Sequence, residues 1–228
     1  SNMESTSSFA CGVQLNLTSE LYSILSAAGM LTSDGRCKVL DSRADGYVRG
    51  EACATCFMTR GSSSGGLGAI IQGSSVNQDG RSSSLTAPNG PAQQSVIVRA
   101  CRDAGVTTSD IGVLQMHGTG TSLGDPIEVG AAMAVLMEHR SHCLALQAVK
   151  SSVGHSEAAA GSAGLAQAIL GIGGHCVSPL PHLRTLNPHV AEVLGETDIS
   201  MIHAPRMPSG RPHVGPSSSG VSLSLIHI

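Results

Sequence analysis

The sequence has few aromatic side chains and little charge, and each shortage limits what the chain can be. Aromatic residues make up 2% of the 228 residues, tryptophan is absent, and 28 residues are glycine. Such a composition relies on close backbone packing through small side chains. Charged residues make up 13%, about half the usual share, and the net charge of -3 gives no basic footprint for nucleic acid. We therefore expect another part of the protein, or a partner, to cover much of the surface.

Long apolar runs and secretion signals are also missing from the sequence. The most apolar run, residues 158–172, is too short to span a bilayer and contains Ser162 and Gln167. It predicts a buried core helix and no membrane span. No signal peptide is visible, and the seven cysteines have no disulfide-like spacing, which favours a reducing compartment. We expect a protein of the cytoplasm or of a plastid.

The most informative stretch is IGVLQMHGTGTSLGDPIEVGAAMAVLM, at residues 111–137. Its apolar start predicts a short strand buried on both faces, and His117 follows that strand directly. A glycine-threonine loop then leads into a helix. For the helix start we predict a capping box, with Asp125 as N-cap, Pro126 at the first helical position and Glu128 three residues after the cap. We assign these two carboxylates that structural role and none in chemistry.

A second strand, predicted at residues 144–149, delivers Lys150 in the same manner. In an open α/β sheet the ends of the two strands can lie side by side, and ligands bind at that edge. His155 follows five residues after Lys150, and Ser156 is expected to cap a long helix. Glu157 could orient Lys150 or His155, but it equally suits the positive end of that helix.

The rest of the chain predicts further helices, strands and loops. We expect a helix from Ser19 to Gly29, an ordered irregular loop at 41–51, strands at 51–59 and 69–76, and a helix from Pro91 to Gly105.

Two short motifs would indicate other chemistry, and we interpret both as structural. Cys53 and Cys56 form a CxxC, but residues three apart on a strand point to opposite faces, so we expect two packed core cysteines. Residues 61–65 satisfy the GxSxG pattern of hydrolases, yet no strand-to-helix turn surrounds them, and a loop is expected there. No histidine pair has the helical spacing of a zinc protease, so we predict no metal site.

Taken together, several motifs resemble the β-ketoacyl synthases, and most closely the ketosynthase domains of polyketide synthases. They are HGTGT followed by GDPIE, KSSVGH at 150–155 and VNQDGRSSSLTAPNGPAQ at 76–93. The resemblance implies an α/β, thiolase-like, layered αβαβα fold, present here as an incomplete, C-terminal portion. It implies the tail of the N-terminal half at 1–64, the C-terminal half at 65–176, and an extension with an aberrant terminus at 177–228.

The resemblance also implies roles for five residues. In such enzymes two histidines, here His117 and His155, hold the thioester carbonyl of the malonyl substrate, and a lysine, here Lys150, supports the second histidine. Thr119 and Thr121 match threonines that bind the phosphopantetheine arm of acyl carrier protein. Simple turn hydrogen bonding is the alternative reading of the two threonines. No bound cofactor is implied, because the substrate is carried on the phosphopantetheine of its carrier.

Two parts of the family pattern are not matched. The cysteine nucleophile of a TACSSSL-like segment would lie upstream of Ser1, and Cys11 stands where the family has an ordinary strand residue. We therefore assign no nucleophile and expect no condensation by these residues alone. Ser219 stands at a gating phenylalanine, and LSLIHI replaces GTNAH. The implied partners are acyl carrier protein, the missing N-terminal half of the domain and, in the full-length protein, a second copy in a homodimer.

Two other functions stay open at this point. One is a non-catalytic module that binds a carrier protein or partner subunits and shares the same fold. The other is an NADP-binding reductase, because Gly118, Gly120 and Gly124 make a GxGxxxG between strand and helix, and Lys150 could meet a 2′-phosphate. That pattern is one residue longer than the dinucleotide fingerprint, and the ribose-binding acid is missing.

Overall fold

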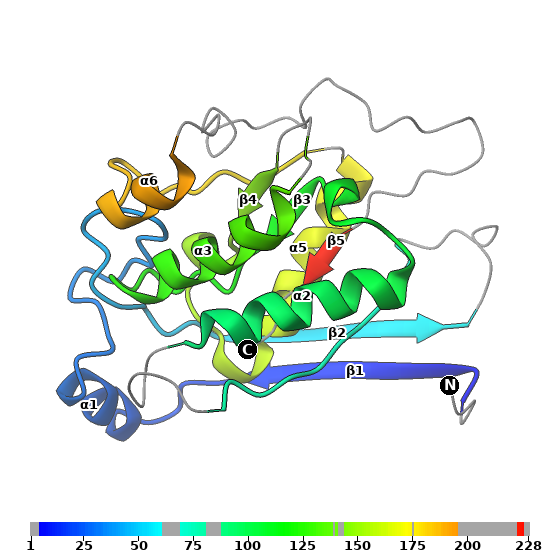
Figure 1. Ribbon diagram of the computed structural model, residues 1–228. Helices are drawn as coiled ribbons and strands as arrows, with labels where there is room; N and C mark the ends of the chain where they lie inside the picture. The colour runs from blue at the N-terminus through cyan, green and yellow to red at the C-terminus, as the bar shows by residue number, and fades with distance from the viewer. Residues whose placement is uncertain are drawn as a thin grey trace.

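The computed structural model describes residues 5–60, 69–80, 88–138, 140, 144–174 and 176–195, together with the backbone of 223–225. Two sheets organise these residues (Figure 1). An antiparallel ribbon joins β1 (Ser7–Gln14) to β2 (Ala52–Thr59). A small parallel sheet has the order β4-β3-β5, made of β4 (Ala145–Gln147), β3 (Val113–Gln115) and β5 (Leu223–Leu225).

Helices pack around and between the two sheets. They are α1 (Glu20–Ala27), α2 (Gly90–Ala104), α3 (Gly124–Leu136), α4 (Lys150–Val153), α5 (Ala160–Gly174) and α6 (Pro188–Leu194), with 3-10 turns η1 (Thr108–Asp110) and η2 (Glu157–Ala159). Helix α5 contacts both the ribbon and the small sheet, while α2 packs on α3, which packs on α6 (Figure 1). None of the helices among the described residues is long and apolar enough to cross a membrane.

The main core gathers around β3, β4 and the inner faces of α2 and α3. Every residue of β3 and β4 is buried, as the apolar runs predicted for strands covered on both faces. The two strands run parallel in register, so the positions after them, where His117 and Lys150 stand, lie at one edge of the sheet. The largest apolar side chains that are fully buried are Leu40, Ile97, Leu114, Leu136, Val39, Val129 and Val190.

The predicted ends of α2 are confirmed. The Asn89 side chain accepts the N–H of Ala92, and Pro91 occupies the first turn, where a missing N–H costs nothing. Gly105 ends the helix with a φ of 69°. The expected helix after Ser19 is also present as α1, and the loop at 41–51 is ordered and irregular.

The strand predicted at 69–76 is wrong. These residues form no strand, and Ile70 and Ile71 are each 58% exposed. The segment runs instead against the end of α2, where Ser74 donates its N–H to Asp103 and Gly73 lies against the backbone of Ala104. The Asp103 carboxylate therefore accepts a main-chain N–H that would bond to a neighbouring strand if this segment belonged to a sheet. The GxSxG run and Ser219 lie outside the described residues.

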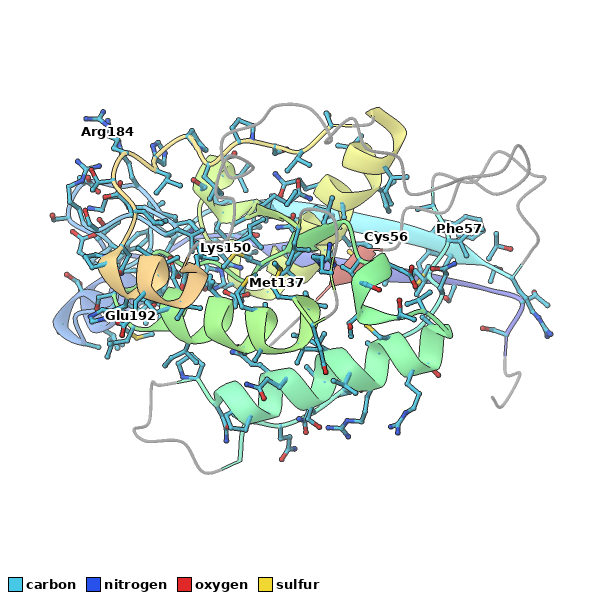
Figure 2. All side chains as sticks on the ribbon, turned by 45° about the horizontal axis from the view of Figure 1, so that its top comes forward. Cys56, Phe57, Met137, Lys150, Arg184 and Glu192 are labelled. Atoms are coloured by element: carbon cyan, nitrogen blue, oxygen red, sulfur yellow. The ribbon has the colours of Figure 1, made fainter. Side chains whose placement is uncertain are left out.

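The prediction of two packed core cysteines is half wrong. Cys53 and Cys56 lie on opposite faces of β2 as expected, but Cys53 is exposed and only Cys56 is partly covered. The reason is the ribbon itself, because α5 and η2 cover one face. On the other face Phe9 is 74% and Phe57 60% exposed, and their ring centroids lie 4.9 Å apart. Figure 2 shows Phe57 projecting from the ribbon.

An uncovered apolar face on an uncharged edge strand is a site for association between chains. We predict that the chain self-associates and that the double variant Phe9→Ser, Phe57→Ser increases the monomer fraction in light scattering. The matched control is Leu170→Ser on α5, which removes an apolar side chain as exposed as Phe9 (74%) from outside the two strands and leaves association unchanged. A monodisperse wild-type monomer with a sharp thermal transition would contradict the prediction.

Candidate active site

The structure brings the two predicted histidines together. His117 follows β3, whereas His155 follows the single turn of α4, which β4 precedes. Their ring centroids lie 5.5 Å apart and the rings meet edge to face, with an interplanar angle of 90°. The Tyr47 ring packs against His155 with its centroid 5.0 Å away. Two imidazoles at this separation can reach one oxygen atom of a ligand.

Two buried carboxylates hold the loop that carries His117. Glu128 accepts the N–H of His117 at 2.6 Å and of Gly118 at 2.9 Å. Asp125 accepts the N–H of Gly120 at 3.1 Å and, across the core, of Leu40 at 2.8 Å. Both carboxylates come from the first turns of α3, so the helix start fixes the loop.

The predicted capping box is therefore wrong. Helix α3 begins two residues earlier than expected, with Leu123 as N-cap and no side-chain cap bond from that residue. Asp125 and Glu128 point back to the preceding loop and do not cap their own helix. The Thr121 hydroxyl instead accepts the N–H of Gly124 at 3.1 Å. This is the turn hydrogen bond that the alternative reading of Thr121 expected.

Burial shifts the protonation of these carboxyl groups. Desolvation raises the pKa of Asp125 to about 6, although the N–H groups of Leu40 and Gly120 oppose the shift. The pKa of Glu128 is also raised, chiefly by desolvation. The N–H groups of His117, Gly118 and Gly120 already bond to these acidic side chains, so they are not available to bind the pyrophosphate of a dinucleotide. This argues against the NADP-binding alternative.

Lys150 contacts the first histidine, not the second as expected. Its ammonium lies 2.5 Å from the carbonyl oxygen of His117 and 3.3 Å from Nδ1 of the same residue. Figure 2 shows Lys150 in the interior, and desolvation lowers the pKa of its ammonium. The parallel register explains the contact, since Lys150 begins α4 shortly after β4, the strand that pairs with β3, and His117 follows β3.

Main-chain groups hold His155. Its N–H donates to the Val48 carbonyl at 2.7 Å and its carbonyl accepts the N–H of Gly50 at 2.8 Å. A Cβ added at Gly50 would clash with the carbonyl oxygen of Val153, so only glycine fits this approach. The ring Nδ1 of His155 accepts the N–H of Glu157 at 3.0 Å.

These contacts determine which ring nitrogen carries the proton. A neutral imidazole whose Nδ1 accepts a hydrogen bond carries its proton on Nε2. This holds for His155 through Glu157, and for His117 when the Lys150 ammonium donates to Nδ1. Both rings then present an Nε2–H donor, which is the state needed to bind an oxygen that gains negative charge.

Other predicted site residues have more limited support. Thr119 is half-buried in the loop after His117. Among the described residues no group of three or more His, Cys, Asp or Glu could hold a metal ion. Cys11 is exposed on the ribbon, beside the Thr55 hydroxyl. Sequence reasoning missed the loop-holding role of Asp125 and Glu128, and it missed Arg49, which binds Glu157.

Comparison with known proteins agrees with this geometry. The C-terminal domain of β-ketoacyl synthase matches residues 68–184 and the N-terminal domain matches residues 2–64. The chain belongs to the β-ketoacyl synthase family. It is 41% identical over 206 residues to a phenolphthiocerol/phthiocerol polyketide synthase of Mycobacterium tuberculosis, covering 88% of this chain and 9% of that protein. Erythronolide synthase EryA2 of Saccharopolyspora erythraea is 40% identical over 203 residues, covering 87% and 6%.

A solved structure supports the same assignment. The ketosynthase from module 6 of the bacillaene synthase of Bacillus subtilis 168 superposes with a TM-score of 0.78 at 36% identity, covering 82% of this chain and 35% of that one. The predicted polyketide synthase type of ketosynthase and the α/β, thiolase-like fold are therefore confirmed. This ketosynthase chain spans less than a tenth of those two curated relatives. The division at residue 64 and the residue roles stay predictions.

The raised pKa of Asp125 has a consequence for stability. A folded pKa above the ordinary value of 3.8 contributes stability that is present below that value and is lost as pH rises through about 6. We predict that the stability advantage of wild type over Asp125→Asn shrinks by roughly 3 kcal/mol between pH ~4 and ~7, at about 1.4 kcal/mol per pKa unit. Denaturant unfolding at several pH values measures it.

Asp34→Asn is the control for this measurement. Asp34 is a half-exposed carboxyl whose pKa is lowered, chiefly by the Thr32 hydroxyl and also by Lys38. Its stability contribution is present above pH 3.8 and lost below it, which is the opposite sign. An advantage over Asp125→Asn that stays constant or grows with pH would contradict the assignment of a buried, protonatable Asp125.

Proposed function

We propose that this chain supplies the decarboxylating half of a ketosynthase active site, in which His117 and His155 bind the thioester oxygen of a malonyl group. The observation that carries the proposal is the pair of rings 5.5 Å apart whose Nδ1 atoms face Glu157 and Lys150. The malonyl group arrives on the phosphopantetheine of acyl carrier protein, and Thr119 and Thr121 bind that arm. Lys150 holds the His117 ring and its carbonyl.

The chemistry needs donors and no strong acid. When the bond between the α carbon and the carboxylate breaks, carbon dioxide leaves and the electron pair is shared by the α carbon and the thioester oxygen. Two Nε2–H groups aimed at that oxygen stabilise the enolate, and neutral imidazoles do not protonate the carbon as it forms. In condensation the carbon then attacks an acyl thioester held on a cysteine, with loss of the thiolate.

The carboxylates under the loop fit this role. Glu128 and Asp125 occupy the amides of His117, Gly118 and Gly120, so the loop does not rearrange when charge develops nearby. Preorganised dipoles of this kind cost no reorganisation during the reaction. We further propose a homodimeric parent protein in the cytoplasm or in a plastid.

The test measures carbon dioxide release from malonyl carrier protein by the chain. We predict slow decarboxylation by wild type, no β-ketoacyl product and no acyl-enzyme in mass spectrometry. His117→Ala and His155→Ala each lower the rate by about 10²–10³-fold, the usual cost of one lost donor. His189→Ala, at an exposed position of α6, is the matched control and leaves the rate unchanged.

Three outcomes would contradict the proposal. Equal rates in wild type and both alanine variants would remove the histidines from the reaction. Binding of carrier protein without any decarboxylation would favour the non-catalytic module. A covalent acyl adduct on Cys11 with β-ketoacyl product would show that the exposed thiol has been misjudged.

A further inference from the structure

An ion pair that the sequence motifs do not explain lies behind His155. The Arg49 guanidinium binds the Glu157 carboxylate through two bonds, at 2.6 Å and 2.9 Å. The Arg49 side chain is only 2% exposed and Glu157 is 24% exposed. Gln14 of β1 donates a third bond to the same carboxylate at 2.9 Å, and the Tyr22 ring lies 4.7 Å from the guanidinium carbon. Such a paired and stacked arginine is fixed in position.

The backbone of Glu157 is strained. Its φ of 37° is positive, which is costly for a residue with a side chain. Strain of this kind persists only where the surroundings hold the residue, and here the contacts of its carboxylate add to the main-chain bonds of η2. The N–H of this strained residue is the donor to His155 Nδ1. The carboxylate anchor and the ring contact therefore belong to one residue.

Arg49 is itself held beside His155. The neighbouring Val48 carbonyl accepts the N–H of His155, and the N–H of Gly50 binds the His155 carbonyl, so Arg49 and His155 form a parallel bridge. Main-chain bonds align the segment around Arg49 with the segment around His155. The ion pair then links the Arg49 side chain to Glu157, two residues after His155. Arg49 also lowers the pKa of the Glu157 carboxyl, which keeps the anchor charged.

We propose that Arg49 and Glu157 are positioning residues that hold the Glu157 N–H against Nδ1 of His155 and so keep the imidazole proton on Nε2, facing His117. The assignment of the proton stands on its own, and its effect on rate rests on the proposed function. Without the clamp, Glu157 relaxes to a negative φ and its N–H turns away from the ring. His155 then samples both tautomers and several ring orientations.

The first measurement is nitrogen NMR of the histidine rings in the labelled chain, with the His155 signals identified by their loss in His155→Asn. In wild type we expect Nδ1 of His155 to be unprotonated and Nε2 protonated. Arg49→Met and Glu157→Ala should mix the tautomers or protonate Nδ1. Arg49→Lys and Glu157→Gln each retain a weaker hydrogen bond between the two side chains, and they should therefore retain most of the Nε2-protonated form of His155.

The control is Arg43→Met. Arg43 also binds a carboxylate, that of Asp41 at 2.9 Å, but it is 53% exposed and no contact joins it to either histidine in the described structure. It should leave the His155 signals unchanged. Native circular dichroism and unchanged ring signals of the exposed His189 in α6 establish that each variant is folded. If Arg49→Met does not fold, Glu157→Gln and Glu157→Ala provide the same comparison.

The second measurement is decarboxylation by the same variants. We expect Arg49→Met and Glu157→Ala to lower kcat about tenfold to a hundredfold with little change in KM, as for a reacting group that is misplaced from a distance. Conservative variants should recover most of kcat. A rate that falls while the His155 tautomer stays at Nε2 would overturn the positioning role and leave the proposed function standing. A tautomer that mixes in a chain with no wild-type decarboxylation would uphold the positioning role and remove the proposed function.

Discussion

The site depends on main-chain N–H groups that are bound by buried carboxylates. A loop of glycines and threonines has no stiffness of its own, and its unpaired amides would be costly in the interior. Glu128 and Asp125 satisfy those amides and tie them to the start of α3, while Asp125 also joins the loop to Leu40 on the far side. Because one helix turn supplies both anchors, the position of His117 follows from the packing of α3.

His155 is also fixed in position, but by main-chain groups and not by buried carboxylates. His155 has no buried carboxylate beneath its own amides, and it relies on the Val48–Gly50 backbone and on the N–H of Glu157. The start of α3 therefore positions His117, and the contact between two loop segments positions His155. Each ring is held by a contact at Nδ1, so contacts within the protein fix the direction in which each Nε2 atom points.

Much of this arrangement could be predicted from the sequence, because two short apolar runs both end in residues capable of chemistry. Parallel strands place such ends at one edge, and this is where His117 and Lys150 lie. The roles of Asp125 and Glu128 could not be predicted in this way. A carboxylate in a first helical turn has the same local pattern whether it caps its own helix or reaches back to a loop, and only tertiary packing decides. Arg49 was missed for a similar reason, since its partner is 108 residues away.

The close approach at Gly50 limits how this protein can vary. No side chain fits between that backbone and the carbonyl of Val153, although Gly50 touches no ligand and stands outside the histidine motifs. A larger residue would push apart the Gly50 and Val153 segments, and with them the main-chain bond from Gly50 that holds the His155 carbonyl. The position of one imidazole is thus sensitive to a methyl group added at a residue that lies outside the histidine motifs.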